Sequence, residues 1–222
     1  ITTKLWIPDI NYDGAKRGFE NSLQRLGLDY LDMYVVHQPY NDYFGAWKAL
    51  EELYDQGRVR AISVDNFTQD RIADFLFWNR VKPTANLLEC NPYYQRPEEQ
   101  AYLMEQNILM QAWSPLAAGQ GDLLHHPALT EIAQVHQKSV AQVVLRWLLQ
   151  RQILPLVKAS GIQRMQENLH IFDFELSEVE MLAIAKLDTG HTCFMPRNTG
   201  KAVTDFLTQA VTGIAPSGKT EK

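Results

Sequence analysis

Residues 31–39 read LDMYVVHQP, an apolar β-type run that ends in polar side chains and a proline. Five similar short runs occur elsewhere in the chain, at 1–6, 59–64, 85–89, 108–113 and 153–157. Segments with helical spacing separate the runs. One of them carries Phe19, Leu23 and Leu26 on one face and ends at Gly27, a residue typical of helix ends. Strands that alternate with helices predict βαβ units and a parallel sheet.

The number of strand-like runs sets the expected fold class, which is α/β with a (β/α)8 TIM barrel. Such a barrel uses about 250 residues and eight strands, whereas this chain has 222 residues and six such runs. We therefore expect one domain over residues 1–222 that starts at the third barrel strand, with the missing strands in a longer parent protein. Residues 191–222 should form a C-terminal loop or tail, with helical character at 202–211.

The composition is that of a globular protein, with 45% hydrophobic and 21% charged residues. A net charge of −5 disfavours nucleic-acid binding, which needs an excess of Lys and Arg. Cys90 and Cys193 are too few for a disulfide framework or a zinc cluster, and they suit a cytoplasmic protein. No apolar run approaches the roughly 20 residues that cross a bilayer, and the first residues lack a signal-peptide pattern. The expected partner is a small molecule.

Polar residues stand where three of the strand-like runs end. Lys4 lies near the end of the first run, His37 ends the second, and Asp65 with Asn66 follows the third. In a parallel barrel the carboxyl ends of the strands open into the active site, so we expect these side chains to converge on one pocket. His37 is the acid–base candidate because it titrates near neutral pH. Taken singly, a solvated Lys and a structural His are the commoner interpretations.

A second group of polar residues follows the last strand-like run. It consists of Lys158, Ser160, Arg164, Glu167 and Asn168. Lys and Arg beside a helix start bind phosphate through charge and free N–H groups, and phosphate sites are common after the last strands of such barrels. A solvated basic helix start explains the same residues equally well.

Other ligand motifs are incomplete. Gly119 and Gly121 begin a G-x-G pattern, but Leu124 occupies the third glycine position of a dinucleotide fingerprint. Gly200 and Lys201 lack the remaining residues of a phosphate-binding P-loop. No closely spaced His, Asp and Glu set has metal-ligand spacing, so we expect no metal site.

Five stretches carry a family resemblance: 1–6 (ITTKLW), 26–32 (LGLDYLD), 36–39 (VHQP), 48–53 (KALEEL) and 57–62 (GRVRAI). Together they resemble the aldo-keto reductase family, along the chain from Ile1 to about Thr192. The first stretch is similar to the family's third strand with its catalytic Lys. The second and third are similar to its fourth strand, which ends in a catalytic His.

The resemblance implies roles for individual residues. Lys4 and His37 would be catalytic, because in the family a Lys lowers the pKa of a proton-donating Tyr and a His hydrogen-bonds the substrate carbonyl. An NADP(H) site would follow from residues that match the family's cofactor positions. These are Asn66 at the nicotinamide amide, Trp113 stacked on nicotinamide, Ser114 and Leu116 at the pyrophosphate, Lys158 and Arg164 at the 2′-phosphate, and Ser160, Glu167 and Asn168 beside them.

The chain also departs from the family pattern. Asp65, which we place in the cofactor-binding group, replaces the usual Ser, and Leu87 replaces a usual Gln. Asn91 replaces a common His, and Gln38 stands where a substrate-pocket Trp is frequent. The family's Tyr and Asp lie before the third strand, outside this chain. The 222-residue chain by itself is therefore expected to be inactive.

The expected function is an NADP(H)-dependent aldo-keto reductase that reduces aldehydes or ketones to alcohols by hydride transfer. It would act on small carbonyl or alcohol substrates as a monomer or weak homo-oligomer, without nucleic-acid or membrane partners. The alternative is a non-catalytic NADP-binding or regulatory barrel that has lost efficient catalysis, an idea motivated by Asp65 and Leu87. A barrel hydrolase that uses Asp and His without a nucleotide is a third hypothesis.

Overall fold

The structure, a computed structural model, describes residues 1–213. The chain divides into two compact units, one formed by Ile1–Thr84 with the segment from Phe194 onward, and the other by Ala85–Cys193. The six strands of the described residues are β1 (Thr2–Leu5), β2 (Leu31–Val36), β3 (Val59–Asp65), β4 (Ala85–Glu89), β5 (Leu109–Trp113) and β6 (Leu154–Leu156). Each lies within a run that the sequence predicted, or extends it by one residue. The expectation of a single domain stays a prediction.

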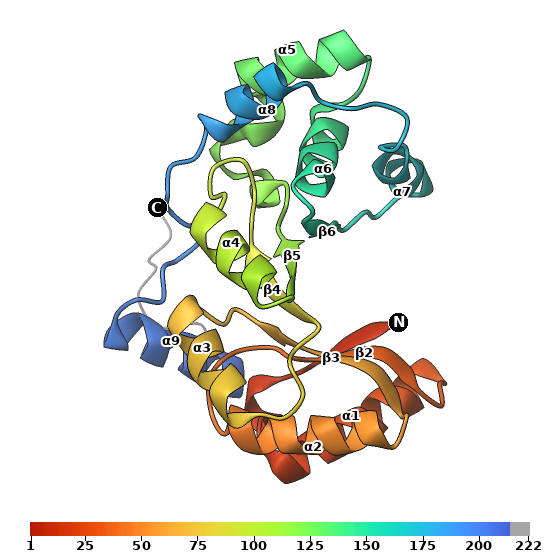
Figure 1. The fold of residues 1–222 in the computed structure, drawn as a ribbon, viewed down its shortest axis with the longest axis vertical. Coiled ribbons are helices and arrows are strands. Elements are labelled where there is room, and N and C mark those ends of the chain that lie inside the picture. Colours follow the sequence, from red (N-terminus) through yellow and green to blue (C-terminus); the bar gives the residue numbers. More distant parts are fainter. Residues whose placement is uncertain (214–222) are drawn as a thin grey trace. The chain divides into compact units, whose positions relative to one another are not determined.

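In the first unit, β1, β2 and β3 are paired in parallel and in chain order (Figure 1). Thr3 of β1 pairs with Tyr34 of β2, which pairs with Ile62 of β3. The helices of this part of the chain are α1 (Tyr12–Leu26), α2 (Tyr43–Asp55) and α3 (Gln69–Trp78). Helices α1 and α2 pack against each other, next to the strands. A helix after each strand is what parallel pairing requires, because the chain must cross over before it can pair again.

Local sequence explains where α1 begins and ends. The Asn11 side chain accepts a 2.8 Å hydrogen bond from the backbone N–H of Gly14, which satisfies one of the free donors of the first turn. At the other end, Gly27 has a φ of +66°, in the left-handed region that favours glycine. Phe19 and Leu23 lie on the buried face between these ends. The predicted helix and its end at Gly27 are confirmed, whereas Leu26, expected on the apolar face, is 46% exposed.

Aromatic side chains form much of the core of the first unit. The ring of Phe19 on α1 meets Tyr34 edge-on at 5.6 Å, and the ring of Trp47 on α2 meets Phe75 on α3 at 4.9 Å. The Trp47 indole also donates a 3.1 Å hydrogen bond to the carbonyl of Val81, so its one polar atom is satisfied. This packing fixes the helices against the strands and thereby fixes the strand ends.

The C-terminal segment packs on the same unit. Helix α9 (Gly200–Thr212) contacts the short 3₁₀ helix η1 (Ile7–Asp9). The indole N–H of Trp6 lies 3.3 Å from the carbonyl oxygen of Ala210, to which it donates. The helix expected at 202–211 is therefore present and slightly longer, whereas the end of the expected tail, residues 214–222, lies outside the described residues.

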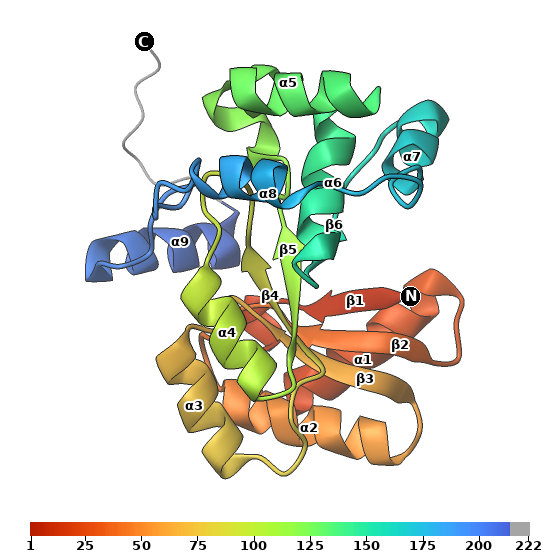
Figure 2. The same cartoon turned by 45° about the horizontal axis from the view of Figure 1, so that its top comes forward.

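In the second unit, β4, β5 and β6 are also paired in parallel and in chain order. The remaining helices are α4 (Pro97–Glu105), η2 (Ala117–His125), α5 (Pro127–His136), α6 (Val140–Gln150), α7 (Ile162–Leu169) and α8 (Glu178–Ala185). Along the chain, the connection from β5 to its neighbour β6 contains two α-helices, α5 and α6, which can be followed in Figure 2. Within residues 1–213, every helix is too short or too polar to cross a bilayer.

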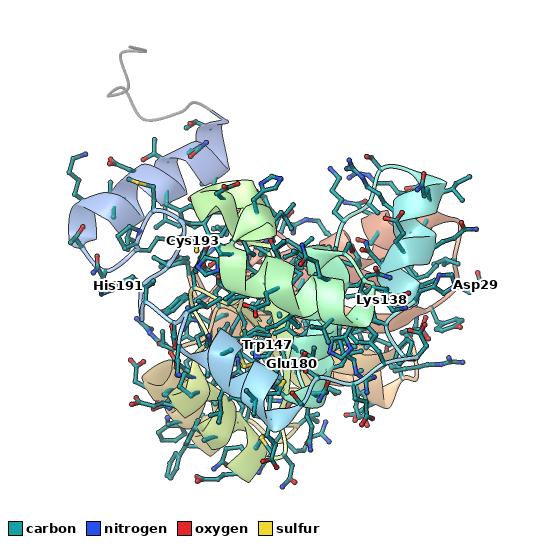
Figure 3. The ribbon with its side chains drawn as sticks, turned by 90° about the horizontal axis from the view of Figure 1, so that it is seen from above. Asp29, Lys138, Trp147, Glu180, His191 and Cys193 are labelled. Atoms are coloured by element: carbon teal, nitrogen blue, oxygen red, sulfur yellow. The ribbon has the colours of Figure 1, made fainter. Side chains whose placement is uncertain are left out.

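Side-chain hydrogen bonds hold the outer helices of the second unit in place. Ser177 and Glu180 form a reciprocal capping box at the start of α8. Glu180 also lies 2.8 Å from the His136 ring nitrogen, which ties α8 to the end of α5. Trp147 of α6 is buried beneath these helices (Figure 3). The second unit thus has a core of its own.

Candidate active site

Three strand ends of the first unit carry the polar residues that the sequence singled out. Lys4 lies on β1, His37 follows β2 directly, and Asp65 is the last residue of β3. The parallel register places them at the same end, because Lys4 pairs with Val35 and the neighbouring Val36 pairs with Val64. The structure thus brings together, at one edge, residues that are up to 61 positions apart in the chain.

The Asp65 carboxylate is the centre of this cluster. Its Oδ2 atom accepts a 2.5 Å hydrogen bond from Lys4 Nζ and lies 3.8 Å from His37 Nε2. Its Oδ1 atom accepts a 2.5 Å hydrogen bond from the Asn66 side-chain amide. The Asp65 side chain is 1% exposed, whereas those of Lys4 and His37 are 31% and 27% exposed. A buried carboxylate therefore binds the partly exposed Lys4 ammonium and lies close to the partly exposed His37 ring.

Burial sets the protonation of the cluster. It raises the pKa of Asp65 to about 6, against the opposing effects of the Lys4 and Arg197 charges. Burial also lowers the pKa of His37 to about 4, and the Lys4 and Arg197 charges add to that effect. At neutral pH, His37 is uncharged, so its 3.8 Å approach to Asp65 is not an ion pair. The ion pair of the cluster is the one between Lys4 and Asp65.

Gln38 lies beside this cluster and contacts a residue that the sequence analysis missed. Its side chain is buried, and its Oε1 atom accepts a 2.9 Å hydrogen bond from Arg197 Nη1. The Arg197 guanidinium also stacks over the Phe206 ring at 4.0 Å from the centroid. Arg197 is 159 positions from Gln38 and lies in the tail, where no motif or periodicity marked it. Only its positive charge would have singled it out.

The predicted cofactor residues of the second unit lie after β5 and around α7. Trp113 ends β5, and Ser114 follows it with a φ of +49°, which turns the chain toward Leu116. Lys158 and Asn168 line a cavity of about 550 Å³ whose other walls are apolar side chains of α6, β6, α7 and the segments that flank α7. These residues therefore lie at or near strand and helix ends, and their role in cofactor binding stays a prediction.

The positively charged side chains near α7 are exposed to solvent. Ser160 and Arg164 are exposed beside the first turn of the helix, whereas Glu167 accepts a 2.9 Å hydrogen bond from Gln163. Within the described part of the chain, neither Lys158 nor Arg164 has an acidic partner. Unpaired cations at a helix N-terminus suit a phosphate group. The convergence of this group with Lys4 and His37 on one mouth stays a prediction.

Two of the departures from the family pattern have structural roles. Leu87 is fully buried within β4. Asn91 shapes the turn after β4, because its Oδ1 atom accepts hydrogen bonds from the backbone N–H groups of Tyr93 and Tyr94. Leu87 therefore packs in the core where the family usually has a Gln, and Asn91 forms a turn where a His is common.

Sequence comparisons give consistent relatives. The model of the Aldo/keto reductase family matches residues 1–189. An uncharacterized oxidoreductase of Bacillus subtilis, YtbE, is 44% identical over 85% of this chain and 67% of its own length. The glyoxal reductase of the same organism is 44% identical over 85% of this chain and 68% of its own length. The chain thus spans about two thirds of these relatives.

Solved structures that resemble this chain are aldo-keto reductases as well. The aldo-keto reductase MGS-M4 from a deep-sea metagenome library has a TM-score of 0.86 at 33% identity, over 89% of this chain and 74% of its own. An aldo-keto reductase of Bombyx mori in complex with NADP has a TM-score of 0.82 at 30% identity, over 87% and 69%. The predicted fold class is confirmed as an incomplete (β/α)8 barrel of six parallel strands. The chain belongs to the aldo/keto reductase family.

Proposed function

We propose that the protein is an NADP(H)-dependent reductase that converts aldehydes or ketones to alcohols by hydride transfer. The observation that carries this proposal is the cluster of Lys4, Asp65 and His37 at adjacent strand ends. Active sites of (β/α)8 enzymes lie at that face. Two relatives named glyoxal reductase and methylglyoxal reductase DkgA support reduction of small carbonyl compounds.

The donor set of the second unit fits the proposed cofactor. Lys158 and Arg164, both without an acidic partner among the described residues, would hold the 2′-phosphate that distinguishes NADP(H) from NAD(H). Ser114 and Leu116 would contact the pyrophosphate. Trp113 would stack on the nicotinamide and Asn66 would bind its amide, with Ser160, Glu167 and Asn168 near the phosphate. When bound, the cofactor supplies the hydride.

Within the chain, His37 and Lys4 would act on the substrate oxygen. Because its pKa is lowered to about 4, His37 is a neutral hydrogen-bond donor at physiological pH and can orient a carbonyl without transferring a charge. The Lys4 ammonium stabilises negative charge that develops on that oxygen or on a neighbouring proton donor. Asp65 fixes the ammonium through the 2.5 Å hydrogen bond, and the Trp6 ring, 4.9 Å from the imidazole, restricts His37.

The second candidate, a non-catalytic NADP-binding barrel, is favoured by two observations. One carboxylate oxygen of Asp65 accepts a hydrogen bond from Lys4 and the other accepts one from Asn66. Leu87 is buried and has no polar side-chain group. Both features would weaken the hold on the nicotinamide carboxamide. The two functions differ in a simple respect, because only the enzyme turns the cofactor over.

The test combines turnover with binding. NADPH consumption by the intact gene product is measured with a panel of aldehydes and ketones, because residues 1–222 by themselves are expected to be inactive. Cofactor binding is followed by quenching of tryptophan fluorescence. We expect turnover with NADPH and a much lower rate at the same concentration of NADH. Binding of NADPH without turnover of any carbonyl compound would establish the non-catalytic alternative, and the absence of both would contradict both proposals.

A further inference from the structure

A fixed cation lies beside the candidate active site, at Arg197. Its Nη1 atom donates a 2.9 Å hydrogen bond to Gln38, the residue that follows His37, and its guanidinium stacks over Phe206. Phe206 in turn contacts Tyr40, with 5.9 Å between the ring centroids. These contacts anchor Arg197 in the first unit and restrict the orientation of its planar group. A guanidinium held in this way loses little further entropy when it binds a ligand.

The charge of Arg197 is not matched by a neighbouring carboxylate. Among the described residues, none of the ion pairs includes Arg197. At neutral pH, Lys4 and Arg197 contribute two positive charges and Asp65 one negative charge, while His37 is neutral, which leaves one positive charge. Arg197 lies close enough for its charge to lower the pKa of both His37 and Asp65. The net positive charge of the cluster therefore favours binding of a negatively charged ligand.

We propose that Arg197 determines substrate specificity by binding a carboxylate carried by the carbonyl substrate. This inference rests on the proposed function and names its substrate class, which is aldehydes or ketones with an acidic group. Gln38 accepts from one of the five N–H donors of Arg197, and within residues 1–213 the other donors remain for a carboxylate. Two such donors match the two carboxylate oxygens.

The position of Arg197 in the chain supports a role in selectivity. The family match ends at residue 189, so Arg197 and α9 lie outside the part that this chain shares with the family model. Lys4 and His37 lie inside that part. The shared residues would then provide the reaction, and the C-terminal segment would select the substrate.

A structural role for Arg197 makes a different prediction. If Arg197 served only to hold α9 through Gln38 and Phe206, its loss would affect acidic and neutral substrates equally. The experiment therefore compares substrates that differ only in charge. These are 4-carboxybenzaldehyde and 4-oxobutanoate, each measured against its methyl ester.

Three variants make the comparison specific. Arg197→Met removes the charge, Arg197→Lys keeps it without the planar fork, and Arg60→Met is the matched control. Arg60 also pairs its guanidinium with a ring, that of Tyr30 at 4.5 Å, but it lies at the opposite end of β3 from Asp65. Thermal unfolding of each variant establishes that it is folded.

We expect the natural protein to have a higher kcat/KM for the acids than for the esters. Arg197→Met should lower this acid-to-ester ratio by about tenfold or more, as loss of a charged hydrogen bond implies. Arg197→Lys should retain part of the preference, and Arg60→Met all of it. Binding of terephthalate, an unreactive dicarboxylate, should weaken in Arg197→Met by fluorescence titration.

The contrary outcomes are distinct. Reduction of esters and acids with equal efficiency, or an equal loss on both in Arg197→Met, would overturn the carboxylate site while the proposed function stands. Failure to reduce any of the four aldehydes or the wider carbonyl panel would overturn the proposed function, and the inference with it.

Discussion

Two groups of cations, one in each unit of the chain, are held in opposite ways. In the first unit, Lys4 is partly buried and is bound to the carboxylate of Asp65, whose side chain is only 1% exposed. In the second unit, Lys158 and Arg164 are exposed, and within the described residues neither has an acidic partner. The first arrangement fixes the position of a charge, and the second leaves charge available to a ligand. The comparison separates residues suited to chemistry from residues suited to binding.

Desolvation explains why the arrangements differ. A carboxylate as buried as Asp65 is costly unless a cation and hydrogen bonds compensate it, so Lys4 and Asn66 are held firmly. Exposed cations such as Lys158 and Arg164 remain hydrated and need no protein partner. A bound phosphate then gains charged hydrogen bonds without first breaking an internal ion pair.

The largest expected effect is on Lys4. Lys4→Met should lower kcat for carbonyl reduction by about 100-fold or more, since under the proposed function it removes the cation beside the reacting oxygen. It should also lower the free energy of unfolding, because it leaves the buried Asp65 carboxylate without its ion-pair partner. The measurements are steady-state kinetics, NADPH binding and chemical denaturation.

Two further variants sharpen this prediction. Combining Lys4→Met with Asp65→Leu removes both charges and should restore stability but not turnover. Lys138→Met breaks another Lys–Asp pair, with Asp173 at 2.7 Å, whose carboxylate is 64% exposed. It should change turnover little. Equal losses of turnover in Lys4→Met and Lys138→Met would show that Lys4 has no special role.

A smaller effect is expected at Arg164, in the open group of the second unit. Arg164→Ala should weaken NADPH binding by about tenfold to hundredfold, because a charged hydrogen bond to phosphate is lost. NADH binding should change little, since NADH lacks the 2′-phosphate. Lys186→Ala, which removes an exposed cation from the end of α8, is the control. Parallel losses for both cofactors would assign Arg164 to general folding.

Much of the fold was predictable because strand and helix periods are local. The apolar run at 31–37 and the helix that ends at Gly27 were both found from neighbouring residues alone. Boundaries were less certain. The last strand runs from Leu154 to Leu156, shorter than the expected 153–157, because hydrogen bonding rather than side-chain type decides where a ladder ends.

The site was predictable only in part. Parallel topology was enough to place Lys4, His37 and Asp65 at neighbouring strand ends. It was not enough to show that the Asp65 carboxylate binds Lys4 across β2, because that contact depends on register and side-chain direction. Arg197 depends on how the tail folds back to Gln38, and no periodic pattern encodes such a return.

The smallest effect concerns the buried state of Asp65. Its ordinary pKa is 3.8 and its folded pKa is about 6, so the folded protein holds this proton more tightly. Its contribution to stability is therefore complete below pH 3.8 and is lost as the pH rises through 6. The slope is at most about 1.4 kcal/mol per pH unit. Denaturation of the natural protein and Asp65→Asn across this range should show the difference.

Asp173 provides a control of opposite sign. Hydrogen bonding from Lys138 lowers the pKa of Asp173, so its contribution is present above pH 3.8 and is lost as the pH falls through its lowered folded pKa. Relative to the natural protein, Asp65→Asn should gain stability with rising pH, whereas Asp173→Asn should lose it. If both variants drifted in the same direction, Asp65 would be as hydrated as Asp173. The contrast between a buried, compensated charge and an open one would then no longer hold.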